Sequence, residues 1–254
     1  MQIVQAPRAL AILYSILIQR ADSHPWLLPA NICPIVPITF LKARVPFEFV
    51  DISAATLHMD LEQAKGRIKT RKFGGLLYAH TYGEPSTPHD FFTSLKNLDS
   101  ELIIADDRCL CIPDFEPVSP ADVILYSTGY AKIVELNFGG YAFVNGDLNY
   151  QPAHLPFNRG DHEELEKCYK DSIEHRSIFF YRDGNWLNTD APLPTWYDYR
   201  QKIENGQKSS LEHRAVLNQI YTSRLPKEIQ LSVSYQTWRF NIRVKDKMRM
   251  RAAG

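Results

Sequence analysis

Residues 101–107 have the sequence ELIIADD, an apolar run that ends in two aspartates. A short apolar run bounded by polar residues is typical of a buried strand. The pattern recurs at residues 47–53, 74–80 and 122–128, and polar, helix-like stretches lie between the runs at 60–70 and 88–98. Because strands that alternate with helices are typical of βαβ units, the sequence predicts an α/β fold with a mostly parallel sheet sandwiched by helices. Such sheets bind ligands beyond the carboxyl ends of their strands.

Outside this region, the segment ALAILYSILI near the N-terminus is apolar almost all round. It is too short to span a bilayer, and no small-residue cleavage site of a signal peptide follows it. We therefore predict a buried helix at about residues 8–20, lying under the sheet. Towards the C-terminus, the sequence predicts helices at 162–175 and 209–225 and a strand at 236–244.

Composition excludes several classes of function. The 254 residues include 29 basic and 29 acidic side chains, so no net charge favours nucleic acid or an anionic membrane as a partner. Four cysteines are too few for a disulfide scaffold, which agrees with a reducing, cytoplasmic location. The tightest cysteine spacing, Cys109-Leu110-Cys111, lacks a second pair of ligands, so we predict no metal site.

Five chemically active side chains fall just after apolar runs, where a ligand site is expected: His80, Asp106, Asp107, Ser127 and Lys132. Each has an ordinary structural explanation, because an aspartate after a strand often caps a helix, a serine often makes a turn, and a loop lysine is usually solvated. One pocket at the strand ends would nevertheless be able to hold all five.

Taken together, these residues match the requirements of a pyridoxal 5'-phosphate (PLP) site. Such a site needs a lysine amine to bond the cofactor, an aspartate to keep the pyridine nitrogen protonated, and hydroxyl or backbone donors for the phosphate. Asp106 precedes Lys132 by one further strand, as a site shared by neighbouring strand ends requires. The glycine-rich patterns of P-loop and dinucleotide-binding proteins are missing from the sequence.

The order of several motifs resembles the DegT/DnrJ/EryC1/StrS aminotransferases, which are PLP enzymes of fold type I that act mainly on nucleotide-linked keto sugars. LLYAHTYGEP at residues 76–85 is similar to a family strand that ends in His-x-Tyr-Gly, and IIADDRC at 103–109 is similar to the family's Glu-Asp-Ala-Ala-Gln. Ser127, Lys132 five residues later, and Gly139-Gly140 match a serine, the cofactor lysine and a glycine pair. The resemblance covers residues 10 to 146 and includes a strand, a loop and a second strand over 27–53.

The resemblance implies a role for each matched residue. Lys132 would bond the cofactor and shuttle a proton, Asp106 would pair with the pyridine nitrogen, and Ser127 would bind the phosphate. The pair Gly139-Gly140 would allow close backbone packing. His80 matches the family pattern, with either a catalytic role or a packing role beneath the ring.

Other positions depart from the family pattern. Cys33 stands where many relatives have an aromatic ring that stacks on the cofactor, and Cys109 stands where they have glutamine or histidine. The phosphate-binding turn at the start of the first helix is Ala6-Pro7-Arg8 here, and Pro7 removes one N–H donor. If Arg108 points at Asp106, it helps to keep that carboxylate ionised.

By the same resemblance, residues 1–205 are expected to form a large cofactor-binding domain and 206–254 part of a small α+β domain. The leading hypothesis is an aminotransferase that moves an amino group from a donor such as glutamate to a keto sugar, with Arg239 as a candidate carboxylate anchor. The alternatives are a shortened homologue that acts as a PLP-binding, scaffold or partner subunit, and a flavodoxin-like nucleotide-binding module. A homodimer is expected, because this family builds its sites at two-fold interfaces.

Overall fold

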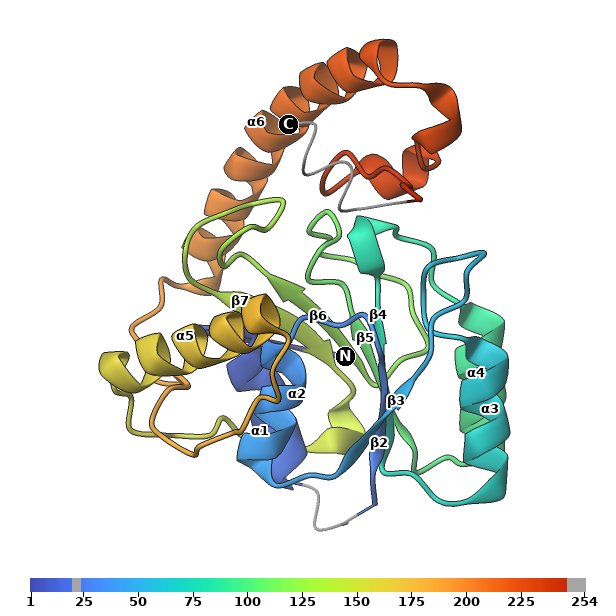
Figure 1. Cartoon of the computed structure of the whole chain (residues 1–254). Coiled ribbons are helices and arrows are strands. Elements are labelled where there is room, and N and C mark those ends of the chain that lie inside the picture. Colours follow the sequence, from blue (N-terminus) through green and yellow to red (C-terminus); the bar gives the residue numbers. More distant parts are fainter. Residues whose placement is uncertain (20–23, 246–254) are drawn as a thin grey trace.

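A seven-stranded sheet forms the centre of the computed structural model, which describes residues 1–19 and 24–245 (Figure 1). The strands are β1 (Gln2–Ala6), β2 (Trp26–Pro29), β3 (Phe47–Val50), β4 (Gly75–Ala79), β5 (Ile103–Asp107), β6 (Val123–Ser127) and β7 (Gly140–Val144). Their order across the sheet is β1-β7-β6-β5-β4-β2-β3. All pairs from β6 to β3 are parallel, whereas β7 is antiparallel to both β6 and β1. The predicted α/β class with a mostly parallel sheet is therefore confirmed.

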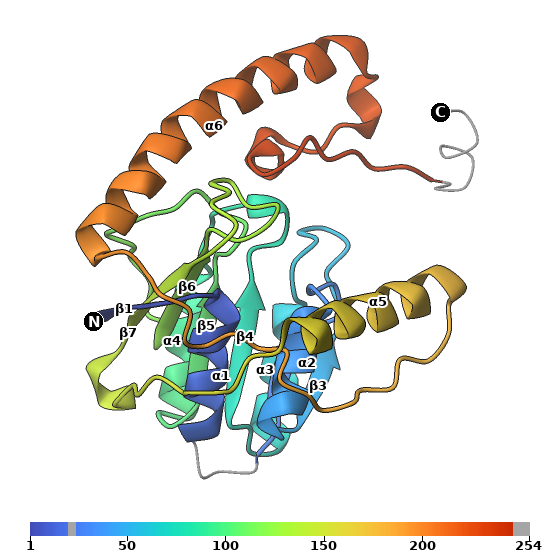
Figure 2. The same ribbon diagram turned by 90° about the vertical axis from the view of Figure 1, so that its left-hand side faces the viewer.

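Helices cover both faces of the sheet (Figure 2). One face, here called the α1 face, is covered by α1 (Ala9–Gln19) and α2 (Ile35–Ala43), and the other, the α3 face, by α3 (Leu61–Thr70) and α4 (His89–Leu98). Successive side chains of a strand point to opposite faces. In β5, Ile103 and Ala105 accordingly join the core under α1, and Ile104 joins the core under α3.

The helix α2 was not expected, because the resemblance over residues 27–53 implies a loop between two strands. The helix begins at Ile35, directly after Pro34, and it contains Pro37. A proline in the first helical turn costs little, because the N–H groups there have no partner within the helix. The buried helix predicted at 8–20 is confirmed, since α1 occupies Ala9–Gln19 and most of its residues are buried.

Two longer helices follow the sheet: α5 (Arg159–His175) packs over α1 and α2, and α6 (Trp196–Arg224) extends away from the sheet (Figure 1). The predicted domain boundary at residue 205 falls inside α6, and the division into two domains stays a prediction. Within residues 1–19 and 24–245, none of the helices combines the length and apolar character needed to cross a membrane.

The strand predicted at 236–244 is wrong. In the described residues after α6, up to residue 245, there are two short 3-10 helices, η3 (Lys227–Ile229) and η4 (Val233–Gln236), and a single bridge that joins Gln230 to Ile242. The described part of the chain offers this segment no neighbouring strand with which to build a ladder. An apolar–polar alternation alone does not make a strand without such a partner. Two further 3-10 turns, η1 (Thr81–Gly83) and η2 (Gly146–Leu148), follow β4 and β7.

Gly140, at the start of β7, lets helix α1 approach the sheet at van der Waals distance. A Cβ at Gly140 would lie 2.4 Å from the backbone nitrogen of Ala9. The preceding residue, Gly139, donates its N–H to the carbonyl of Pro7 at 2.7 Å, so the entry to α1 is tied to the entry to β7. The close packing that the sequence predicts for this glycine pair is confirmed.

We expect Gly140→Ala to lower the free energy of unfolding by about 1–3 kcal/mol, because the new methyl group meets backbone atoms that cannot rotate away. Urea denaturation followed by circular dichroism measures the change. Gly146→Ala is the matched control, since, apart from its chain neighbours, no atom of the described residues lies within 4 Å of its Cβ position. A Gly140→Ala protein as stable as the control would contradict the close approach.

Candidate functional site

Lys132 lies on the loop between β6 and β7. Its side chain is half-buried, while the next two residues, Ile133 and Val134, are buried in the core of the α3 face. Among the residues that the structure describes, none forms a hydrogen bond or ion pair with the Lys132 amine; only the backbone carbonyl is engaged. The loop is therefore anchored by its apolar residues, and the amine is left free for chemistry.

Asp107 and Ser127 end neighbouring strands on the α1 face. Asp107 continues the alternation of Ile103 and Ala105 in β5, and Ser127 continues that of Leu125 in β6. The two strands are paired so that Asp107 stands opposite Leu125. Both polar side chains therefore emerge at the carboxyl edge of the sheet, where ligands bind in parallel folds.

Cys109 connects this pair to Lys132. Its N–H donates to Oδ1 of Asp107 at 3.0 Å. Burial raises the pKa of the Cys109 thiol and the Asp107 carboxylate raises it further, whereas the positive charge of Lys132 opposes the rise. Lys132 is therefore close enough to act on Cys109 electrostatically. The structure brings Lys132, Asp107, Cys109 and Ser127 to the same end of the sheet.

Ser127 also lies beside the N-terminus of α1. It pairs with Gly140 across the β6–β7 ladder, and Gly140 packs against Ala9. The Ser127 hydroxyl accepts the Gly129 N–H at 3.3 Å. The turn after β6 thus carries a hydroxyl beside a helix N-terminus, a combination that suits a phosphate group.

Asp106 belongs to a separate, buried cluster on the α3 face. Its carboxylate is 0% exposed. Oδ1 lies 2.6 Å from Nε2 of His80, and Oδ2 accepts the Nε–H of Arg108 at 3.0 Å. The other ring nitrogen of His80 donates to the carbonyl of Glu84 at 2.7 Å. Burial alone would raise the pKa of Asp106, but the hydrogen bond from His80 and the charge of Arg108 outweigh it and lower the pKa.

The sequence places these residues in one pocket, but in the structure they form two groups. Asp106 and His80 lie in the buried cluster on the α3 face, apart from Asp107, Ser127 and Lys132. Arg108 does point at Asp106 and helps to keep it ionised. However, both oxygens of Asp106 already have protein partners, and the carboxylate faces away from Ser127 and α1. His80 is engaged at both ring nitrogens within the same buried cluster.

Two further predicted residues lie at the edges of the site. Cys33 is exposed just before α2, on the α1 face. Arg239 is exposed and its guanidinium lies 4.3 Å from the centre of the Trp238 ring. That ring in turn donates its Nε1–H to the carbonyl of Ala131 at 2.6 Å. Arg239 is thus held close to the loop of Lys132.

Sequence reasoning missed the contribution of α5, whose position depends on long-range packing. Its Leu165 is buried with Tyr14 of α1 and Ile38 of α2. Burial raises the pKa of Tyr169 in the same helix, and the nearby Glu166 and Cys33 raise it further. Tyr169 is therefore within electrostatic range of the cysteine at the predicted stacking position. No local sequence pattern signals the packing of α5 on α1 and α2.

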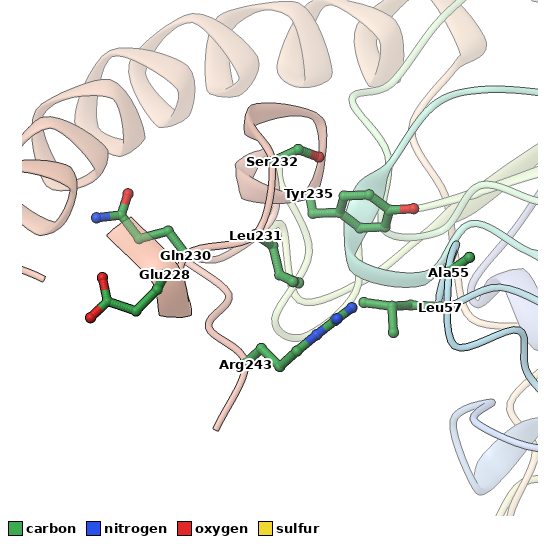
Figure 3. A pocket seen from close by; sticks show the side chains of 8 residues that line it. All are labelled: Ala55, Leu57, Glu228, Gln230, Leu231, Ser232, Tyr235 and Arg243. Carbon is green, nitrogen blue, oxygen red and sulfur yellow. The ribbon is translucent and has the colours of Figure 1, made fainter. Parts of the chain in front are cut away.

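A hollow of about 290 Å³ separates the C-terminal segment from the turn at residues 54–57 (Figure 3). It is lined by Ala55, Leu57, Glu228, Gln230, Leu231, Ser232, Tyr235 and Arg243. The hydroxyl of Tyr235 donates to the carbonyl of Thr56 at 2.5 Å and so joins the two sides. None of the predicted cofactor residues lines this hollow.

Comparison with solved structures identifies proteins of the same fold. A DegT/DnrJ/EryC1/StrS aminotransferase from Brucella abortus matches with a TM-score of 0.66 at 15% identity, over 99% of this chain and 68% of its own. Sugar aminotransferase CalS13 from Micromonospora echinospora matches with a TM-score of 0.61 at 16% identity, over 98% and 69%. NtdA from Bacillus subtilis, solved with bound cofactor PMP, matches with a TM-score of 0.66 at 15% identity, over 99% and 57%.

The chain thus spans 57 to 69% of the length of these three proteins. No protein-family model and no curated protein matches it in sequence. The resemblance stated from the sequence is confirmed for the fold, which is that of the large domain of fold type I.

Proposed function

We propose that this chain is a PLP-dependent aminotransferase that moves an amino group from an amino acid such as glutamate to a keto sugar, one linked to a nucleotide. The observation that carries the proposal is the meeting of Lys132, Asp107 and Ser127 at one edge of the sheet, beside the N-terminus of α1. When bound, PLP supplies an electron sink for the carbanion chemistry of amino-group transfer. The shared fold with sugar aminotransferases supports the substrate class.

Residues of this chain can be assigned to both ends of the cofactor, its phosphate and its pyridine nitrogen. Ser127 and the N-terminus of α1 would bind the phosphate, with Arg8 as a nearby cation. We assign the pyridine nitrogen to Asp107 in place of Asp106, since Asp107 shares the face of Ser127, whereas both oxygens of Asp106 already have protein partners. The negative charge of Asp107 would hold the proton on that nitrogen.

Lys132 would bond the cofactor and then act on the substrate. Its amine has no competing partner among the described residues, so it is available both as a nucleophile and, once released, as the base that moves a proton to and from the substrate carbon. Cys109 would flank the ring with a neutral thiol, because its raised pKa keeps the proton on sulfur. Cys33 would lie at the ring face, where Tyr169 is close by.

Substrate binding and assembly are parts of the same proposal. Arg239, stacked on Trp238 near the lysine loop, is the candidate anchor for the donor carboxylate. We propose a homodimer, because closed two-fold symmetry is the commonest form of soluble oligomers. Residues 1–205 would form the cofactor-binding domain, and residues 206–254 would belong to a partial small domain.

A second candidate is a PLP-binding partner or scaffold subunit that does not turn over. The observation that favours it is Pro7, which contributes no N–H at the phosphate end of the site. Exposure of the PLP-loaded protein to glutamate separates the candidates. A shift of the cofactor absorbance to that of the amine form supports the aminotransferase, and an unchanged spectrum with glutamate and other amino donors supports the scaffold.

The proposal predicts where the cofactor bonds. We expect incubation with PLP, reduction with borohydride and peptide mass spectrometry to locate the phosphopyridoxyl group on Lys132. Lys132→Arg should remove this label, because arginine offers no nucleophilic amine at neutral pH. Lys69→Arg is the control, since Lys69 is an exposed lysine on α3. A label on a different lysine, or none, would refute the assignment.

A further inference from the structure

The C-terminal part of the chain is hydrogen-bonded to the backbone of the Lys132 loop. Three successive carbonyls of the loop accept hydrogen bonds from side chains of α6 and the segment after it. The bonds run from Trp238 Nε1 to Ala131 at 2.6 Å, from Arg214 Nη2 to Lys132 at 3.4 Å, and from Ser210 Oγ to Ile133 at 2.5 Å.

The three donors are joined to one another. Arg214 donates from Nε to the hydroxyl of Ser210 at 3.2 Å, and from Nη1 to the carbonyl of Trp238. One guanidinium therefore touches both of the other donors as well as the loop. Gly206 allows α6 to approach the loop closely enough for these hydrogen bonds, since a Cβ there would lie 2.8 Å from Cγ1 of Val134.

These hydrogen bonds hold the loop at the residue whose backbone conformation is least favourable. Ala131, directly before the lysine, has a φ of 57°, in the left-handed region that non-glycine residues rarely adopt. Such a conformation persists only where surrounding contacts impose it. The hydrogen bond from Trp238 ends on this residue, and the other two hold the residues that follow. The loop carbonyls are thus engaged by the C-terminal part of the chain, and the Lys132 amine is left without a hydrogen bond or ion pair from any residue in the described ranges.

We propose that Ser210, Arg214 and Trp238 are positioning residues that hold the Lys132 amine at the strand ends. This inference rests on the proposed role of Lys132 as the group that bonds the cofactor. It assigns a task to the segment after α6 that is independent of any substrate contact. The segment fixes the reactive lysine before a ligand arrives, so less ordering is required on binding.

Trp238→Phe tests the inference, because it keeps an aromatic ring against the Arg239 guanidinium but removes the N–H donor. Ser210→Ala removes a second donor. We expect each variant to lower PLP labelling of Lys132 by about fivefold at sub-saturating PLP, the effect of losing one hydrogen bond. We also expect acylation of Lys132 by a small amine reagent to rise severalfold relative to exposed Lys69, because the released loop becomes more accessible.

Trp196→Phe is the matched control, since this ring packs against Phe115 and Tyr141 at the start of α6. It should change neither readout. Circular dichroism and the thermal midpoint verify that each variant folds. An unchanged ratio of Lys132 to Lys69 acylation in Trp238→Phe would overturn the positioning role. Absence of PLP label at Lys132 in the unaltered protein would instead overturn the proposed function. The ratio of Lys132 to Lys69 acylation would still test whether Ser210 and Trp238 position the loop.

Discussion

Asp107→Asn is expected to lower the turnover of the PLP-loaded protein with glutamate by about a thousandfold, while the fold and the bond to Lys132 remain. A neutral amide would not hold the proton on the pyridine nitrogen, so the ring would lose most of its power to accept electrons. Single-turnover absorbance measurements follow the conversion of the cofactor, and borohydride labelling confirms that it is still bonded.

Two further variants serve as comparisons for this test. Asp90→Asn, on the exposed first turn of α4, is the matched control and should leave turnover unchanged. Asp106→Asn distinguishes the two neighbouring carboxylates, since the fraction of that protein which folds should retain turnover. If Asp106→Asn abolishes turnover in folded protein and Asp107→Asn does not, the pyridine nitrogen belongs to Asp106 and the assignment given above is wrong.

The second large effect concerns stability. Asp106→Asn is expected to lower the free energy of unfolding by about 3–5 kcal/mol, because it leaves a buried guanidinium and imidazole without their carboxylate. Arg108 is only 8% exposed and His80 only 1% exposed, so water does not replace the lost partner. Urea denaturation at pH 7 measures the difference from the unaltered protein.

The dependence of this difference on pH provides an independent check. The folded-state pKa of Asp106 is lowered, so its contribution is complete above the unfolded-state pKa of about 3.9 and is lost as pH falls through the lower, folded-state value. The stability gap between the unaltered protein and Asp106→Asn should therefore narrow below about pH 4. A gap that stays constant down to pH 2 would mean that the charge of Asp106 does not stabilise the fold.

The sequence was sufficient for the strands predicted at 47–53, 74–80, 101–107 and 122–128, because strand formation there depends on local apolar runs, but it did not predict β1. The runs ending in Ser127 and Asp107 each became a buried parallel strand. The sequence did not, however, predict on which face of the sheet the side chain of each aspartate lies. Both faces of this sheet are covered by helices, so Ile103 and Ile104 are equally apolar, and polarity gives no indication of which neighbour points at α1.

The remaining errors arise from contacts between distant segments. The run at 236–244 alternates like a strand, but whether it forms one depends on a pairing partner elsewhere in the chain. The hydrogen bonds from Ser210, Arg214 and Trp238 to the lysine loop link residues separated by 77 to 107 positions. No window of local sequence contains both ends of such a contact.

The pairing of β1 with β7 has a consequence for how the protein is made. Residues 2–6 form the edge strand beside residues 140–144, so this segment has no partner in the sheet until residues 140–144 have been synthesised. Pairing across so long a separation is slow to form, because a large loop must close first. Since the entry to α1 is tied to Gly139, the proposed phosphate-binding end of the site must be completed late in folding, after the parallel strands that precede it. During that interval, β6 presents an unpaired edge on which β7 must dock before another chain does.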